Sequence, residues 1–175
     1  MALTYGDLAD RWGDEQLIHL PLDKIASKLT FNFDLLSPGG ALPSDVPYLF
    51  TIHLAGQPDL FNEIHSVSPD RAPNRFLVIG AAPETLKMLY GLDMATGAVA
   101  LMNTRDQSIE PINSSLALFV EFLHRIAPWV TPNAPLHTIA EANELRTELR
   151  ALDPSAFDSP ESWWSMVLDR LAQTS

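Results

Sequence analysis

Residues 76–103 read FLVIGAAPETLKMLYGLDMATGAVALMN, and this stretch decides the fold. Its β-favouring runs, 76–80, 85–92 and 98–103, are separated by short segments of turn-forming residues. The last two runs flank 93–97, a short loop that ends in glycine, and this pattern predicts an antiparallel hairpin. We therefore expect a meander of antiparallel strands at the centre of the chain.

Outward from the meander, turn-forming residues set the expected loops and strands. Residues 48–54 and 108–112 have the composition of further short strands. The segment 37–47 is dense in proline and glycine, which predicts a loop. The segment 56–74 is polar, contains three prolines and is predicted to be a long irregular loop. Loops of that length are often functional.

The residues before the strands predict N-terminal helices. Thr4 and Asp7 have the spacing of a capping box, and Gly13 is expected to end the helix that they begin. A second helical period follows Pro21, a residue that suits the first position of a helix.

The residues after the strands predict helices again. An apolar stripe from Leu116 indicates a helix that stops before Pro128. A capping box predicts the next helix from Thr138, and the last helix is expected to begin at Pro160 with Trp164 buried. The predicted fold class is α+β: an antiparallel or mixed central sheet with N-terminal and C-terminal helices packed around it, in a single domain over residues 1–175.

Composition limits the possible partners. The chain has 175 residues, no cysteine, 46% hydrophobic residues and a formal net charge of −11. The excess acid lies before residue 71 and after residue 140. Such a field repels nucleic acids and anionic membranes and attracts basic proteins. No secretion signal or membrane-spanning run is present. We expect a cytoplasmic protein whose partner is a basic protein, with no nucleic acid and no membrane.

The motifs of common catalytic and metal sites are missing from the sequence. No phosphate-binding glycine loop is present, the histidines form no zinc motif, and only Glu63 and His65 could form a close ligand pair. Ser114 and Ser115 lack the surroundings of a nucleophile elbow. We expect no catalytic residue, no metal and no cofactor, and hence no enzyme. A hydrolase that uses paired carboxylates stays open as an alternative.

Several segments together resemble one family. Residues 41–52 (ALPSDVPYLFTI), the hairpin at 88–103, PINSSLALFVEFL at 111–123, and LRALDPSAFDSPESWWSMVLDRL at 149–171 are similar to the SUKH superfamily. The resemblance is to its fourth immunity subfamily, from bacterial polymorphic toxin systems, and it covers about residues 41–172.

The resemblance implies a protein that neutralises a cognate toxin domain, of nuclease or deaminase type, by direct binding. It also implies structural roles for the shared motifs: Asn113 and Ser114 as a helix cap, Gly97 as a turn and Trp164 in the core. The alternative is a non-toxin interaction module or effector chaperone of the same fold. We expect a monomer or a weak homodimer.

Two acidic segments are the predicted partner-binding surfaces. In the first, Asp59, Glu63 and Asp70 surround the aromatic Phe61, as an interface with a basic partner would require. The alternative is that Phe61 and Ile64 fold back onto the sheet and the acids are solvated. The second candidate is the acidic N-terminal helix, with Asp7, Asp10 and Asp14.

Overall fold

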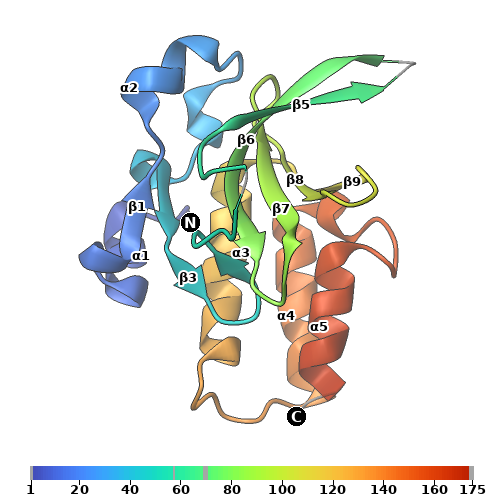
Figure 1. Ribbon diagram of the computed structural model, residues 1–175. Coiled ribbons are helices and arrows are strands. Elements are labelled where there is room, and N and C mark those ends of the chain that lie inside the picture. Colours follow the sequence, from blue (N-terminus) through green and yellow to red (C-terminus); the bar gives the residue numbers. More distant parts are fainter. Residues whose placement is uncertain (1, 57, 69–70, 174–175) are drawn as a thin grey trace.

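An antiparallel sheet forms the centre of the computed structural model, which describes residues 2–56, 58–68 and 71–173 (Figure 1). The strands of the sheet are β3 (Asp45–Val46), β4 (Phe50–Thr51), β5 (Glu63–Ser68), β6 (Arg71–Ala82), β7 (Thr85–Asp93), β8 (Val99–Asn103) and β9 (Ile109–Asn113). They follow the order β3-β4-β6-β7-β8-β9, and β5 pairs with β6.

β6 joins the parts of this sheet. One of its edges pairs with β7, and the other pairs with β5 along its first half and with β4 at Ala81. β7 and β8 form the predicted hairpin, with Leu92 opposite Val99. Gly97 has a φ of 80° in the turn, a conformation that glycine adopts without strain. The central meander is confirmed.

Helices surround the sheet, as α+β predicts. α1 (Tyr5–Trp12) and α2 (Leu22–Ile25) lie to one side, with a ribbon of β1 (Leu17–His19) and β2 (Ala41–Pro43). α3 (Leu116–Val130), α4 (Ile139–Leu152) and α5 (Trp163–Gln173) cover one face of the sheet (Figure 1). Short 3-10 turns occupy 14–16, 26–28, 33–35, 38–40 and 154–157.

The main core lies between the sheet and the C-terminal helices. Leu77 and Leu92 are paired across β6 and β7, and both are fully buried in this core with Phe119 and Trp164. Burial of such side chains stabilises the fold by roughly 1.5–3 kcal/mol each. Gly80 lets β6 approach Phe50 closely, because a Cβ at that position would overlap the Phe50 ring. The opposite face of β6 carries a smaller apolar cluster that Ile64 helps to cover.

A buried polar joint fastens the sheet to the last helix. Trp164 donates its indole N–H to Asn113 Oδ1 at 2.8 Å, and Asn113 Nδ2 donates to Asp153 Oδ2 at 3.1 Å. Asp153 also accepts hydrogen bonds from the Ser114 amide at 2.8 Å and the Ser155 hydroxyl at 2.8 Å. We call Asn113, Ser114, Asp153, Ser155 and Trp164 the polar joint. It brings together two of the segments that carry the family resemblance.

Parts of the sequence prediction for residues 37–54 are wrong. The segment expected to be a loop contains β2 and β3, and the strand expected at 48–54 shrinks to β4. The reason is a tight turn in which the Leu49 amide donates to the Val46 carbonyl at 3.0 Å. Tyr48 has a φ of 67° in this turn and is 66% exposed. Local β propensity at 48–54 was therefore overridden by the turn.

Three predictions at the C-terminal helices are also wrong. α3 continues past Pro128, which lies in its last turn, so that few helical hydrogen bonds are lost. The N-cap of α3 is Ser115, whose Oγ accepts from Leu118 N at 3.1 Å; Asn113 and Ser114 belong to the polar joint instead. α5 begins at Trp163 rather than at Pro160, because Glu110 of β9 accepts a hydrogen bond from the Trp163 amide at 3.1 Å.

Candidate functional site

The first predicted binding segment, 56–74, is not the long irregular loop that we expected. Its second half forms β5 and the start of β6, because these strands pair with each other. Phe61 is half-buried against the main core, and its amide donates to the Val78 carbonyl at 2.7 Å. Ile64 packs against the smaller apolar cluster on the opposite face of β6. Phe61 and Ile64 therefore pack against the sheet, in agreement with this part of the alternative stated above.

The acids of this segment have different environments. Glu63 Oε1 lies 2.8 Å from Lys28 Nζ and its Oε2 3.9 Å from Arg75 Nε, and the bond to Lys28 lowers the pKa of the Glu63 carboxyl. Asp59 is exposed. Asp70 lies outside the described residues. The charge of Glu63 is thus largely matched by cations of this chain.

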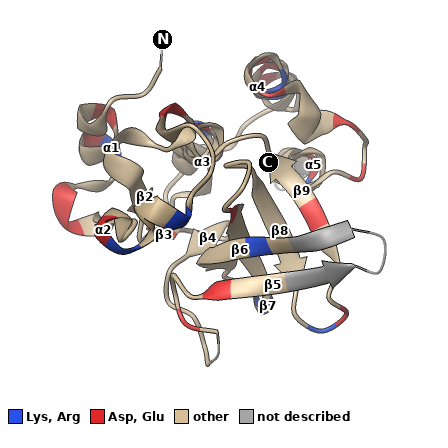
Figure 2. Ribbon diagram, turned by 90° about the horizontal axis from the view of Figure 1, so that it is seen from above, with Lys and Arg blue, Asp and Glu red and all other residues tan. Residues whose placement is uncertain are grey.

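The second predicted segment, α1 and the turn after it, presents its acids at the surface. Asp7 forms the predicted capping box with Thr4, and hydrogen bonds from Thr4 lower its pKa. Asp10 is exposed, and Asp14 accepts a hydrogen bond from the Tyr5 hydroxyl at 2.9 Å. α1 and β5 lie on different sides of the molecule (Figures 1 and 2), so the structure does not bring the two predicted segments together.

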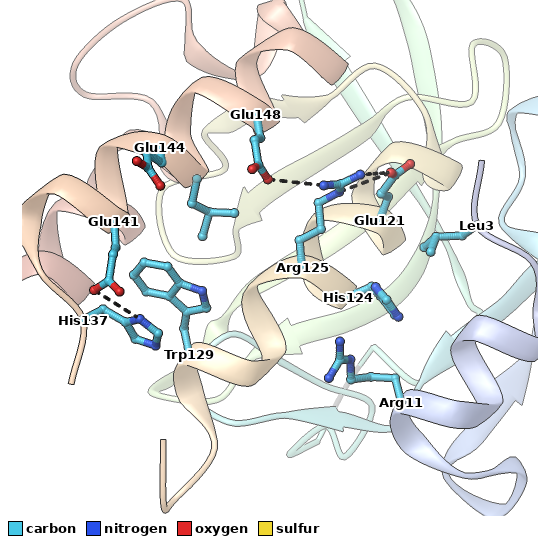
Figure 3. A pocket seen from close by; sticks show the side chains of 11 residues that line it. Leu3, Arg11, Glu121, His124, Arg125, Trp129, His137, Glu141, Glu144 and Glu148 are labelled. Carbon is cyan, nitrogen blue, oxygen red and sulfur yellow. Dashed lines mark hydrogen bonds and ion pairs between the residues drawn. The ribbon is translucent and has the colours of Figure 1, made fainter. Parts of the chain in front are cut away.

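A hollow of about 490 Å³ between α1, α3 and α4 is a candidate site that we did not predict from the sequence (Figure 3). α3 contributes Glu121, Arg125 and Trp129 to its lining. Arg125 is held between two carboxylates: its Nη2 lies 3.0 Å from Glu121 Oε1, four residues earlier in α3, and its Nη1 lies 3.4 Å from Glu148 Oε2 of α4. These ion pairs fix the guanidinium between the two helices.

The α4 side of the hollow combines an aromatic stack with carboxylates. The rings of Trp129 and His137 are stacked with centroids 3.7 Å apart. His137 Nδ1 lies 3.7 Å from Glu141 Oε2, while the buried His137 Nε2 has no hydrogen-bond partner among the described residues. Glu141 belongs to the confirmed capping box with Thr138, whose amide lowers its pKa. Glu144 completes this side and is exposed.

The α1 side of the hollow carries cationic and partly buried groups. Arg11 of α1 projects toward α3 (Figure 3). His124 of α3 lies edge-on to Trp12, with ring centroids 5.8 Å apart. Burial lowers the pKa of His124, and the nearby Arg11 lowers it further. The neutral imidazole is therefore favoured in the folded protein.

The hollow is lined mainly by charged and aromatic side chains. It contains glutamates, arginines, histidines, leucines and a tryptophan, and no serine, threonine or cysteine that could act as a nucleophile. Glu141 is committed to a helix cap, and its lowered pKa makes it a poor general acid. Within the described part of the chain, no group of three or more His, Asp or Glu side chains is placed to hold a metal ion. No helix in that part is long and apolar enough to cross a membrane.

The hollow escaped sequence reasoning because its lining comes from three separate parts of the chain. One local signal was visible: Glu121 and Arg125 have the i,i+4 spacing of an ion pair. Trp129 lies beyond the helix end expected before Pro128 and gave no such signal. Nothing local, however, indicates that α1 and α4 lie on either side of α3.

The fold and these surfaces define an α+β protein with a charged hollow between α1, α3 and α4. The family model of the SUKH-4 immunity protein matches residues 3–170, and the chain belongs to that family. The match starts well before residue 41, where the recognised resemblance began. No curated protein and no solved structure matches the chain. Family membership implies that the chain is an immunity protein.

Proposed function

We propose that this immunity protein neutralises a cognate bacterial toxin domain, of nuclease or deaminase type, by binding it directly and without catalysis. The observation that carries the proposal is the family match over residues 3–170. The lining of the hollow, which offers charged and aromatic surface, supports a binding role. Toxins that act on nucleic acids need basic surfaces to hold phosphates, and an acidic protein is suited to cover them.

The charge of this chain supports a basic partner. With a formal net charge of −11, the protein attracts a basic toxin over distances of about a Debye length, roughly 8–10 Å at physiological salt. We propose that Asp7, Asp10 and Asp14 help to steer this encounter. Asp59, Glu63, Asp70 and Phe61 stay a proposed second surface, with less support because Glu63 is already paired and Phe61 packs inward.

Coexpression tests the proposed function. The gene next to the one for this chain in its genome of origin is expressed in a bacterial host with and without this protein. We expect growth arrest from the neighbouring product alone, rescue by this chain, and a stable complex of the two proteins on size-exclusion chromatography with light scattering. A neighbouring product that binds without being toxic would instead support the interaction module or chaperone. Toxicity without rescue or complex would refute the proposal.

A further inference from the structure

The hollow between α1, α3 and α4 combines acidic side chains with a concave shape. Its volume of about 490 Å³ lies in the range of ligand-binding pockets, roughly 300–1,000 Å³. Trp129 forms an aromatic part of its wall, and Leu145 of α4 adds apolar surface. A side chain that enters the hollow can therefore lose contact with water on several sides.

The charges in the hollow do not cancel. Four glutamates face two arginines in the lining. Arg125 is shared by Glu121 and Glu148, so that this guanidinium offsets part of their charge. The Glu144 side chain makes no hydrogen bond or ion pair with any described residue. The surplus negative charge therefore lies on the α4 side, while Arg11 lies on the α1 side (Figure 3).

Two further features on the α4 side indicate a missing partner. The buried His137 Nε2 has no hydrogen-bond partner in the described part of the chain, which is uncommon for a buried polar atom. Leu136, the residue before His137, is 80% exposed and contacts the solvent with almost its whole side chain. A partner that covered Leu136 would bury apolar surface at the edge of the hollow, and it could supply a hydrogen bond to His137 Nε2.

We propose that the hollow receives a lysine or arginine side chain of the partner toxin, and that Leu136 is buried at the edge of the same contact. The alkyl part of the incoming side chain packs on Trp129, and its cation is paired by the exposed Glu144 side chain of α4. A long cationic side chain suits this site because its stem is apolar and its head is charged. The inference rests on the proposed function and names the surface and chemistry of its partner.

A charge-matched pair of double variants tests the site. Glu144→Lys/Glu148→Lys reverses two charges in the hollow, and Asp23→Lys/Glu161→Lys makes the same change in net charge at exposed positions outside the lining. Both double variants lose a similar amount of long-range attraction to a basic toxin. A difference between their affinities therefore measures the local contact in the hollow. Binding to the purified domain of the neighbouring toxin is measured by surface plasmon resonance. We expect the hollow variant to bind about tenfold or more weakly than the control.

A third variant and a spectroscopic readout complete the test. Leu136→Asp leaves the fold unchanged because the side chain is exposed, and we expect faster dissociation of the toxin. The Trp129 indole resonance, assigned with Trp129→Phe, is expected to shift when unlabelled toxin is added to the labelled protein. Thermal unfolding checks that each variant is folded.

The outcomes separate this inference from the proposed function. If the parent protein neither rescues growth nor binds the toxin, the proposed function fails. If the parent binds but the two double variants differ by less than about twofold, the contact is long-range charge alone, and the inference is overturned. An unshifted Trp129 resonance in a complex that forms normally would overturn it as well.

Discussion

The polar joint under α5 and the hollow beside α1 contain the same kinds of groups: a tryptophan, carboxylates and hydrogen-bond donors. The buried polar groups of the joint have hydrogen-bond partners, whereas some polar groups in the hollow have none in the described part of the chain. In the joint, Trp164 is fully buried, and both Asp153 oxygens and the Asn113 side chain have partners. In the hollow, Trp129 is half-buried and Glu144 has no partner among the described residues.

This comparison distinguishes the polar groups that stabilise the fold from those that remain available for binding. A buried polar group is costly when it is unpaired and specifies the fold when every partner is present. A partly open site can keep unpaired charge because water still solvates it. We therefore expect substitutions in the joint to change folding strongly, and those in the hollow to change folding weakly.

The largest effect is expected for Trp164→Ala, which should reduce the free energy of unfolding by about 3–5 kcal/mol through loss of a fully buried indole. Urea titration of the parent and variant measures this change. Trp129→Ala is the matched indole in the hollow and should cost less than half as much. Equal losses for the two tryptophans would remove the distinction between joint and hollow.

A smaller effect is expected for Asp153→Ala, about 2–3 kcal/mol, because the Asn113 amide and the Ser114 N–H would lose a buried acceptor. Asp153→Asn is the conservative control, since its amide oxygen can still accept from the Ser114 N–H, and it should cost less. Equilibrium unfolding compares the three proteins. A loss below about 0.5 kcal/mol for the alanine variant would mean that the joint contributes little.

Glu148→Ala tests the stability of the hollow itself. The Glu148 side chain is 61% exposed, and its partner Arg125 keeps the ion pair with the buried Glu121, so only a pair screened by water is lost. We expect a loss of less than about 1 kcal/mol in the free energy of unfolding. A loss as large as that of Asp153→Ala would show that the hollow is as important for folding as the joint.

Local sequence patterns predicted the parts of the fold that are held by local contacts. The capping boxes at Thr4 and Thr138 and the hairpin turn at Gly97 need only residues a few positions apart, and all three are confirmed. α5 begins where Glu110 of β9 reaches the Trp163 amide, across 53 residues of sequence. Such a long-range contact leaves no signal in the residues around Pro160.

The candidate site was harder to predict than the fold, for the same reason. The composition of 56–74 indicated an aromatic anchor among acids, but the orientation of Phe61 depends on how its neighbours pair with β6. In the hollow, Arg125 meets Glu148 only because α3 and α4 pack together. The acid content, and with it the expectation of a basic partner, comes from composition, whereas the shape of a surface depends on tertiary packing.

The smallest effect concerns the pH dependence of the hollow. Burial, and then Arg11, lower the pKa of His124, opposed in part by Asp7, so folding favours the neutral imidazole. Above the pKa of a histidine in the unfolded chain, about 6.5, His124 does not reduce the free energy of unfolding. As the pH falls from there toward the lower pKa of the folded state, His124 destabilises the fold progressively.

His124→Gln should therefore lose less stability than the parent between pH 7 and pH 5, in urea titrations at each pH. His53→Gln, at an exposed histidine outside the hollow, is the matched control and should follow the parent. If His124→Gln loses as much stability as the parent over this interval, the imidazole is solvated rather than buried, and the α1 side of the hollow is more open than the contact with Trp12 indicates.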